Sequence, residues 1–129
     1  MSRLVYDTRF FIEHFYSSDD QVLVRTKGEL ETEREKYVST IVLHEVYAIS
    51  LEKEGRSVAK LRTEVIRAHF GTVDVDMKIA VQAAEIRHRY KIPMADSMIA
   101  ATSELLKAGC VTDDKHLTQI KEIKTRWIK

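Results

Sequence analysis

Four acidic residues, Asp7, Glu45, Asp96 and Asp114, have the types and positions expected of a metal-binding site. Each follows a strand-like or turn segment and lies at or just inside a segment with a helical pattern. In an open α/β sheet the carboxyl ends of the strands form one edge, so acids that follow different strands can meet there. Carboxylates that meet repel one another unless a cation lies between them. The four acids therefore predict an oxygen-ligand site for a hard divalent ion, Mg²⁺ or Mn²⁺.

Glu45 carries the strongest single signal of the four. Its neighbours on the same helical face are all apolar, namely Ile41, Val42, Ala48 and Ile49. An isolated buried carboxylate costs several kcal/mol, so a glutamate on such a face needs a partner. That partner is a metal ion if the residue is functional, or a buried arginine or lysine if it is structural.

The other three acids each have a structural alternative at the start of a helix. Asp96 follows Pro93 on an apolar helical face, where an acid in the first turn is stabilised by about 0.3–1 kcal/mol through the helix dipole. Asp7 and Asp114 have the residue type of N-caps or turn residues. Asp113 is a second candidate for the fourth position, because it directly precedes Asp114. We favour Asp114.

The elements that must position these acids alternate along the chain. Strands separated by helical stretches of ten or more residues imply βαβ units, and hence a three-layer α/β fold with a mostly parallel central sheet flanked by helices. Gly55 and Gly109 are expected to end two of the helices. Strand patterns are found at 4–6, 37–39, 72–75, 110–112 and 123–128, and helical patterns at 8–15, 22–30, 41–54, 57–69, 77–90 and 93–108, with a short one after 114.

Length and composition suit one globular domain, residues 1–129. Charged residues make up 32% and hydrophobic residues 44%, without a run of about 18 apolar residues that would indicate a membrane span. The first residues lack the basic and apolar regions of a signal peptide, and the single cysteine, Cys110, cannot form an internal disulfide. We therefore expect a cytoplasmic protein without a membrane partner.

The positive charge is concentrated at the end of the chain. Residues 115–129 hold five basic residues and one acid, a net charge of +4 in a chain whose total is +1, which leaves −3 for the first 114 residues. A basic segment beside an acidic pocket suits a phosphate-backbone substrate. Lysines that guard the edge of a terminal strand are an equally simple explanation.

Other catalytic motifs lack defining residues. His44-Glu45 begins like a zinc-protease helix, but the second histidine belongs at the position of Ala48. An aspartyl-nucleophile phosphatase would need a second aspartate at the position of Arg9. No glycine-rich phosphate loop, nucleophile elbow or paired CxxC is present. The five histidines are scattered and are interpreted as surface or core residues rather than ligands.

Four segments of the chain together resemble the PIN-domain family, and the resemblance covers essentially the whole sequence. The length of the chain and the order of these segments are similar to those of the VapC toxin branch of the family. By position, Asp7, Glu45 and Asp96 match the three main acids of the family, and Asp114 its usual fourth. The segments are Val5-Tyr6-Asp7-Thr8, Ser39 to Glu45, Pro93-Met94-Ala95-Asp96-Ser97-Met98-Ile99-Ala100-Ala101 and Val111-Thr112-Asp113-Asp114-Lys115-His116-Leu117.

The resemblance implies a divalent-metal-dependent endoribonuclease with all four acids at the metal. It also implies an RNA substrate, a homodimer and a cognate VapB-like antitoxin that holds the toxin inactive. Thr8, Ser39 and Thr112 match small hydroxyl residues near such sites and are expected to orient the acids or a metal-bound water. Two alternatives stay open, a non-catalytic PIN-like binding module and a DNA-directed nuclease of the same fold.

Overall fold

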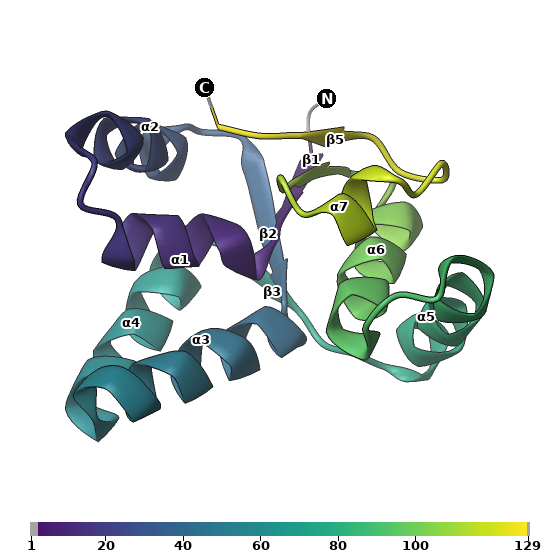
Figure 1. Ribbon diagram of the computed structural model, residues 1–129, viewed down its shortest axis with the longest axis horizontal. Coiled ribbons are helices and arrows are strands. Elements are labelled where there is room, and N and C mark those ends of the chain that lie inside the picture. Colours follow the sequence, from purple (N-terminus) through teal and green to yellow (C-terminus); the bar gives the residue numbers. More distant parts are fainter. Residues whose placement is uncertain (1–2, 129) are drawn as a thin grey trace.

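The computed structural model describes residues 3–128 and contains a five-stranded sheet with helices on both sides (Figure 1). The strand order is β3-β2-β1-β4-β5, and each of the four pairings is parallel. The expected α/β fold with a mostly parallel sheet is confirmed. The strands are β1 (Arg3–Tyr6), β2 (Glu35–Ser39), β3 (Gly71–Val73), β4 (Gly109–Val111) and β5 (Thr125–Arg126).

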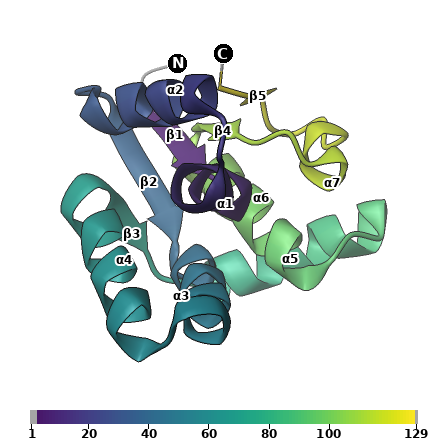
Figure 2. The same cartoon turned by 60° about the vertical axis from the view of Figure 1, so that its left-hand side comes forward.

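Between residues 3 and 128, seven helices connect and cover these strands. In Figure 1 the strands run between α1, α2 and α4 on the left and α5 and α6 on the right. The hairpin of α3 and α4 lies at the opposite end of the molecule from the two termini, as Figure 2 also shows. No helix within residues 3–128 is long and apolar enough to cross a membrane. The helices are α1 (Thr8–Tyr16), α2 (Asp20–Glu31), α3 (Thr40–Glu54), α4 (Arg56–His69), α5 (Met77–Tyr90), α6 (Met94–Leu106) and α7 (Lys115–Thr118).

Large and small side chains pack the two faces of β1 differently. On one side, Tyr6 meets Phe10 of α1 and Phe70 edge to face, with ring centroids 4.9 and 5.0 Å apart. On the other side, α6 contacts β1, β2 and β4 and buries the small side chains Ala100 and Ala101. Small residues let a helix approach a sheet closely, so α6 and its first turn are held firmly against the strands.

Capping side chains set several helix boundaries. Ser39 ends β2 and accepts a hydrogen bond from the backbone N–H of Ile41, so it caps α3. Gly55 ends α3 with a φ of 90°, a conformation that favours glycine. The expectation for Gly109 is wrong, because α6 ends at Leu106, Lys107 takes the left-handed position with a φ of 53°, and Gly109 begins β4.

Candidate metal centre

The topology brings the four predicted acids to the carboxyl edge of neighbouring strands. Asp7 directly follows β1, and Glu45 lies in the second turn of α3, which follows β2. Asp114 follows β4 after two residues, and Asp96 lies in the first turn of α6. Because β2, β1 and β4 are parallel neighbours, their carboxyl ends share one edge. Figure 1 shows the first turns of α1, α3 and α6 around this edge, with α7 beside them.

Asp7 is a buried carboxyl whose partner comes from the neighbouring strand. The residue is 2% exposed, and its Oδ2 accepts a hydrogen bond of 2.6 Å from Thr112 Oγ1. It occupies the N-cap position of α1, but its side chain makes no capping hydrogen bond. The pKa of Asp7 is raised to about 7, mainly by burial and also by the negative charges of Asp96 and Asp114, while the Thr112 hydrogen bond lowers it. Helix capping therefore does not explain this carboxyl.

Asp96 is affected by the other acids in the same way. Burial raises its pKa to about 6, with further contributions from the negative charges of Asp114 and Glu45, while His116 acts in the opposite direction. Asp7 also acts electrostatically with Asp96 and Asp114. Electrostatic effects of this kind place the four acids near one another, and Asp96 and Asp114 each have a ligand atom within 4.8 Å of the other and of His116. Like charges near one another favour either protonation or a bound cation.

Glu45 is held by a hydroxyl group rather than by a cationic side chain. Its Oε1 accepts a hydrogen bond of 2.6 Å from Thr8 Oγ1, the first residue of α1. Among the ion pairs of residues 3–128, none includes Glu45. The structural alternative of a buried arginine or lysine partner is thus not what the structure shows. The half-buried carboxylate faces the other acids with one hydroxyl donor.

Asp113 and Asp114 have different surroundings, although they are adjacent in sequence. Arg9 binds both oxygens of Asp113, at 3.0 and 3.1 Å, and also lies 3.5 Å from Glu13. Asp114 instead caps α7 through the N–H of His116 and interacts with Asp7 and Asp96. Asp113 is therefore occupied by a guanidinium group at the exposed rim, whereas Asp114 faces the acidic group.

His116 also lies in this region, although the sequence pattern did not predict a histidine near the acids. Its Nδ1 lies 3.2 Å from Asp96 Oδ2 and 3.2 Å from Asp114 Oδ1. One atom from each of these three residues lies within 4.8 Å of the others. The signal in the sequence is its position two residues after Asp114, within one turn of the same short helix.

The donor atoms suit Mg²⁺ or Mn²⁺. Four carboxylates, from the end of β1, from α3, from the start of α6 and from the residue before α7, would supply oxygen ligands, and burial together with the neighbouring carboxylates raises the pKa values of Asp7 and Asp96. Hard divalent ions prefer carboxylate oxygens, whereas zinc sites usually combine histidine and cysteine. The one cysteine, Cys110, is buried in β4. The residues present therefore fit the divalent ion that the sequence predicts.

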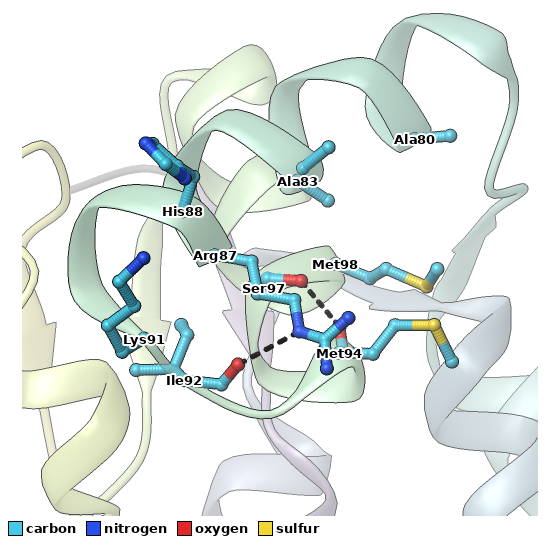
Figure 3. A pocket seen from close by; sticks show the side chains of 10 residues that line it. Ala80, Ala83, Arg87, His88, Lys91, Ile92, Met94, Ser97 and Met98 are labelled. Carbon is cyan, nitrogen blue, oxygen red and sulfur yellow. Dashed lines mark hydrogen bonds between the residues drawn. The ribbon is translucent and has the colours of Figure 1, made fainter.

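A separate groove of about 590 Å³ lies between α5 and α6 (Figure 3). Alanines of α5 and the side chains of Met94 and Met98 form its apolar surface, and His88 and Lys91 lie at one end. The Arg87 side chain reaches across the groove toward Met94 and donates to the backbone carbonyl of Ile92. None of the four acids lines it. Ser97, next to Asp96 in sequence, does line it, so the groove lies on the neighbouring face of α6.

Comparison with known proteins identifies the family. The family model described as PIN domain matches residues 4–123. No curated protein sequence matches the chain significantly. Among solved structures, VapBC2 from Rickettsia felis bound to a promoter DNA fragment has a TM-score of 0.80 at 14% identity, and covers 98% of this chain and 99% of its own. DNA-bound VapBC from Salmonella typhimurium also has a TM-score of 0.80, at 20% identity and 98% coverage of both chains.

A third similar structure is VapC20 of Mycobacterium tuberculosis, a Sarcin-Ricin loop cleaving toxin. It has a TM-score of 0.74 at 17% identity and covers 94% of this chain and 98% of its own. At these identities the solved structures share the fold with this chain. The family-model match spans nearly the whole sequence, and with the parallel sheet it shows that the chain belongs to the PIN domain family.

Proposed function

We propose that this protein is a divalent-metal-dependent endoribonuclease, the toxin of a VapBC-type toxin-antitoxin pair. The observation that carries the proposal is the group of four carboxylates at one sheet edge, of which Asp7 and Asp96 have raised pKa values. Closely placed carboxylates disfavour one another's charged forms, so a divalent cation is the ordinary partner of such a group. Membership of the PIN domain family and the toxin-antitoxin proteins with the same fold support this assignment.

The side chains would divide the work as follows. Asp7 and Asp96 would bind the ion directly, Glu45 would bind the same or a second ion, and Asp114 would bind directly or through water. A bound Mg²⁺ or Mn²⁺ supplies water activation and neutralises charge on the phosphoryl and leaving oxygens. The hydroxyl of Thr112 holds one oxygen of Asp7, so the other is free to face the ion.

Thr8 does the same for Glu45. Its hydroxyl holds one oxygen of Glu45 in place. The side chain is therefore already ordered and loses little conformational entropy when a cation binds. Lys115 and the basic residues near the C-terminal end would attract the phosphate backbone without reading its sequence. Arg9 is less suited to that role, because Asp113 and Glu13 already bind it.

Cleavage of a mixed panel of structured and single-stranded RNA and DNA tests the proposal. The purified chain and its Asp96→Asn variant are incubated with Mn²⁺, Mg²⁺ or EDTA. We expect RNA cleavage that requires the metal and falls at least about 100-fold in the variant. Cleavage of DNA alone would favour the DNA-directed nuclease. Metal binding without cleavage of any substrate, including in the presence of a cell's total RNA, would favour the non-catalytic binding module.

We also propose a cytoplasmic, single-domain protein that pairs with a VapB-like antitoxin and forms a homodimer. Apolar side chains on α5 and α6 support a protein interface, because Met77, Val81 and Met94 are 82%, 60% and 53% exposed. Light scattering would give the mass of the particle in solution. A Val81→Asp variant should then shift a dimer toward the monomer, and an unchanged mass would place the interface elsewhere.

A further inference from the structure

The position of the His116 ring beside the acids is not explained by packing in the core. Its side chain is 50% exposed, while the next residue, Leu117, is fully buried and anchors α7 to the core. The backbone N–H of His116 donates to Asp114 Oδ1 at 2.8 Å, which fixes the start of the short helix. This capping bond needs only the backbone, so it would form with any side chain except proline at position 116.

The ring nitrogen lies where a ligand of the same ion would lie. Nδ1 is 3.2 Å from Asp96 Oδ2 and 3.2 Å from Asp114 Oδ1. Neighbouring ligands of an octahedral ion with bonds of about 2.1 Å are about 3 Å apart, so this spacing fits one ion bound by all three groups. The same spacing also fits a ring N–H that is shared between two carboxylates. The two arrangements differ in whether Nδ1 offers a proton or a lone pair.

We infer that His116 is a nitrogen ligand of the metal bound by Asp96 and Asp114. This inference rests on the proposed metal site. With the ring proton on Nε2, the lone pair of Nδ1 points between the two acids and replaces one water or carboxylate oxygen. The half-exposed ring needs no rearrangement of the core to do this, since Leu117 carries the packing.

A nitrogen ligand changes which ion the site prefers. Mg²⁺ prefers oxygen ligands and gives up water reluctantly, whereas imidazole binds first-row transition metals, among which Mn²⁺ is the weakest binder in the Irving–Williams order. The ratio of Mn²⁺ affinity to Mg²⁺ affinity should therefore be larger than it would be for a site of four carboxylates alone. Loss of the imidazole should weaken Mn²⁺ binding by about tenfold or more and leave Mg²⁺ binding nearly unchanged.

The test compares Mn²⁺ bound to the wild-type protein with that bound to His116→Asn and His116→Ala, without any RNA. Asparagine places an amide N–H₂ close to the position of Nδ1, so it keeps a hydrogen-bond donor but has no nitrogen lone pair. His88→Ala, at another exposed histidine on α5, is the matched control. Pulsed electron paramagnetic resonance detects histidine nitrogen at the metal, and protein grown with ¹⁵N-histidine identifies the signal.

We expect the histidine signal in the wild-type protein and in His88→Ala, and its loss in both His116 variants together with the tenfold loss of Mn²⁺ affinity. Tight Mn²⁺ binding without a histidine signal, or with equal affinity in His116→Asn, would overturn the inference and leave the proposed metal site intact. If neither Mn²⁺ nor Mg²⁺ bound to the wild-type protein, the proposed function and this inference would both fail.

Discussion

Thr112 donates its hydroxyl hydrogen to Asp7 Oδ2 at 2.6 Å, a contact between residues 105 positions apart in the sequence. The same Thr112 oxygen accepts the backbone N–H of Asp114 at 3.0 Å. One hydroxyl thus joins the ends of β1 and β4 and sets two of the four acids relative to each other.

Replacement of Thr112 by valine should therefore alter Asp7 and leave the backbone N–H of Asp114 without its acceptor, while the fold is kept. Valine has nearly the same shape, but it removes the hydrogen bond that lowers the pKa of Asp7, so that pKa should rise above about 7. We expect Mn²⁺ affinity at pH 7 to fall about tenfold and to recover partly at pH 8.5. Titration calorimetry at both pH values measures this. Thr118→Val, at an exposed position on α7, is the control, and equal losses in the two variants would contradict the prediction.

Without metal, Asp7 should make the protein less stable as the pH rises. Its pKa is raised from 3.8 to about 7 mainly by burial, so between these values the folded protein holds a proton that the unfolded chain has released. The contribution of Asp7 to the free energy of unfolding is therefore most favourable below about pH 4 and becomes less favourable as the pH rises to about 7. Asp7→Asn removes this dependence and should raise the Tm at pH 8 by about 3 °C or more, with a smaller difference at pH 5.

Thermal unfolding in EDTA at pH 5 and pH 8 checks this dependence. Added Mn²⁺ should raise the Tm of the wild-type protein at pH 8, because the ion binds the folded state, and should raise that of Asp7→Asn much less. A variant that is less stable than the wild-type protein at pH 8 in EDTA would show that Asp7 is not under electrostatic strain.

Thr8 should matter through its hydroxyl group alone. Thr8→Val keeps the shape of the side chain but leaves Glu45 without its donor, whereas Thr8→Ser keeps the donor. Partners that orient a metal ligand commonly change affinity or activity by about 10–100-fold when they are lost. We expect a loss of this size in RNA cleavage by Thr8→Val and nearly normal cleavage by Thr8→Ser. Equal cleavage by both variants would mean that the hydrogen bond does not position Glu45.

The two adjacent aspartates should differ in metal binding. Asp113 is bound by Arg9 through two hydrogen bonds, whereas Asp114 lies beside Asp96 and His116. Asp114→Asn should weaken Mn²⁺ binding about tenfold or more. Asn is also a good N-cap, so this variant should keep the stability of α7. Asp113→Asn should bind Mn²⁺ as the wild-type protein does, and the reverse order of affinities would assign the fourth acid to Asp113.

A buried lysine provides a prediction about stability that is independent of the site. Lys36 of β2 is 7% exposed, and its Nζ donates to the backbone carbonyls of Glu29, Leu30 and Thr32 at the end of α2. Lys36→Met fills similar space but leaves these carbonyls without their donor, at a cost of about 1–3 kcal/mol. Urea unfolding should show this loss while Mn²⁺ affinity stays unchanged, and a variant of wild-type stability would contradict it.

The sequence by itself determined the order of strands and helices, the parallel sheet and the candidate acids after the strands. These features follow from local patterns: apolar runs such as Leu4 to Tyr6, capping residues such as Ser39, and helical segments long enough to return the chain for a parallel strand. The acids could be named because parallel strands end at one edge, whatever their order in the sheet.

Only the tertiary structure decided which side chains meet there. Thr112 reaches Asp7 because β4 lies beside β1, and Thr8 reaches Glu45 because α1 and α3 begin at the same edge. Arg9 binds the carboxylate of Asp113, about 100 residues away in the sequence, and the His116 ring lies beside Asp96, about 20 residues away. Such contacts depend on strand order and on the direction of each side chain. Neither of these can be read from the hydrophobic periodicity of a local sequence window.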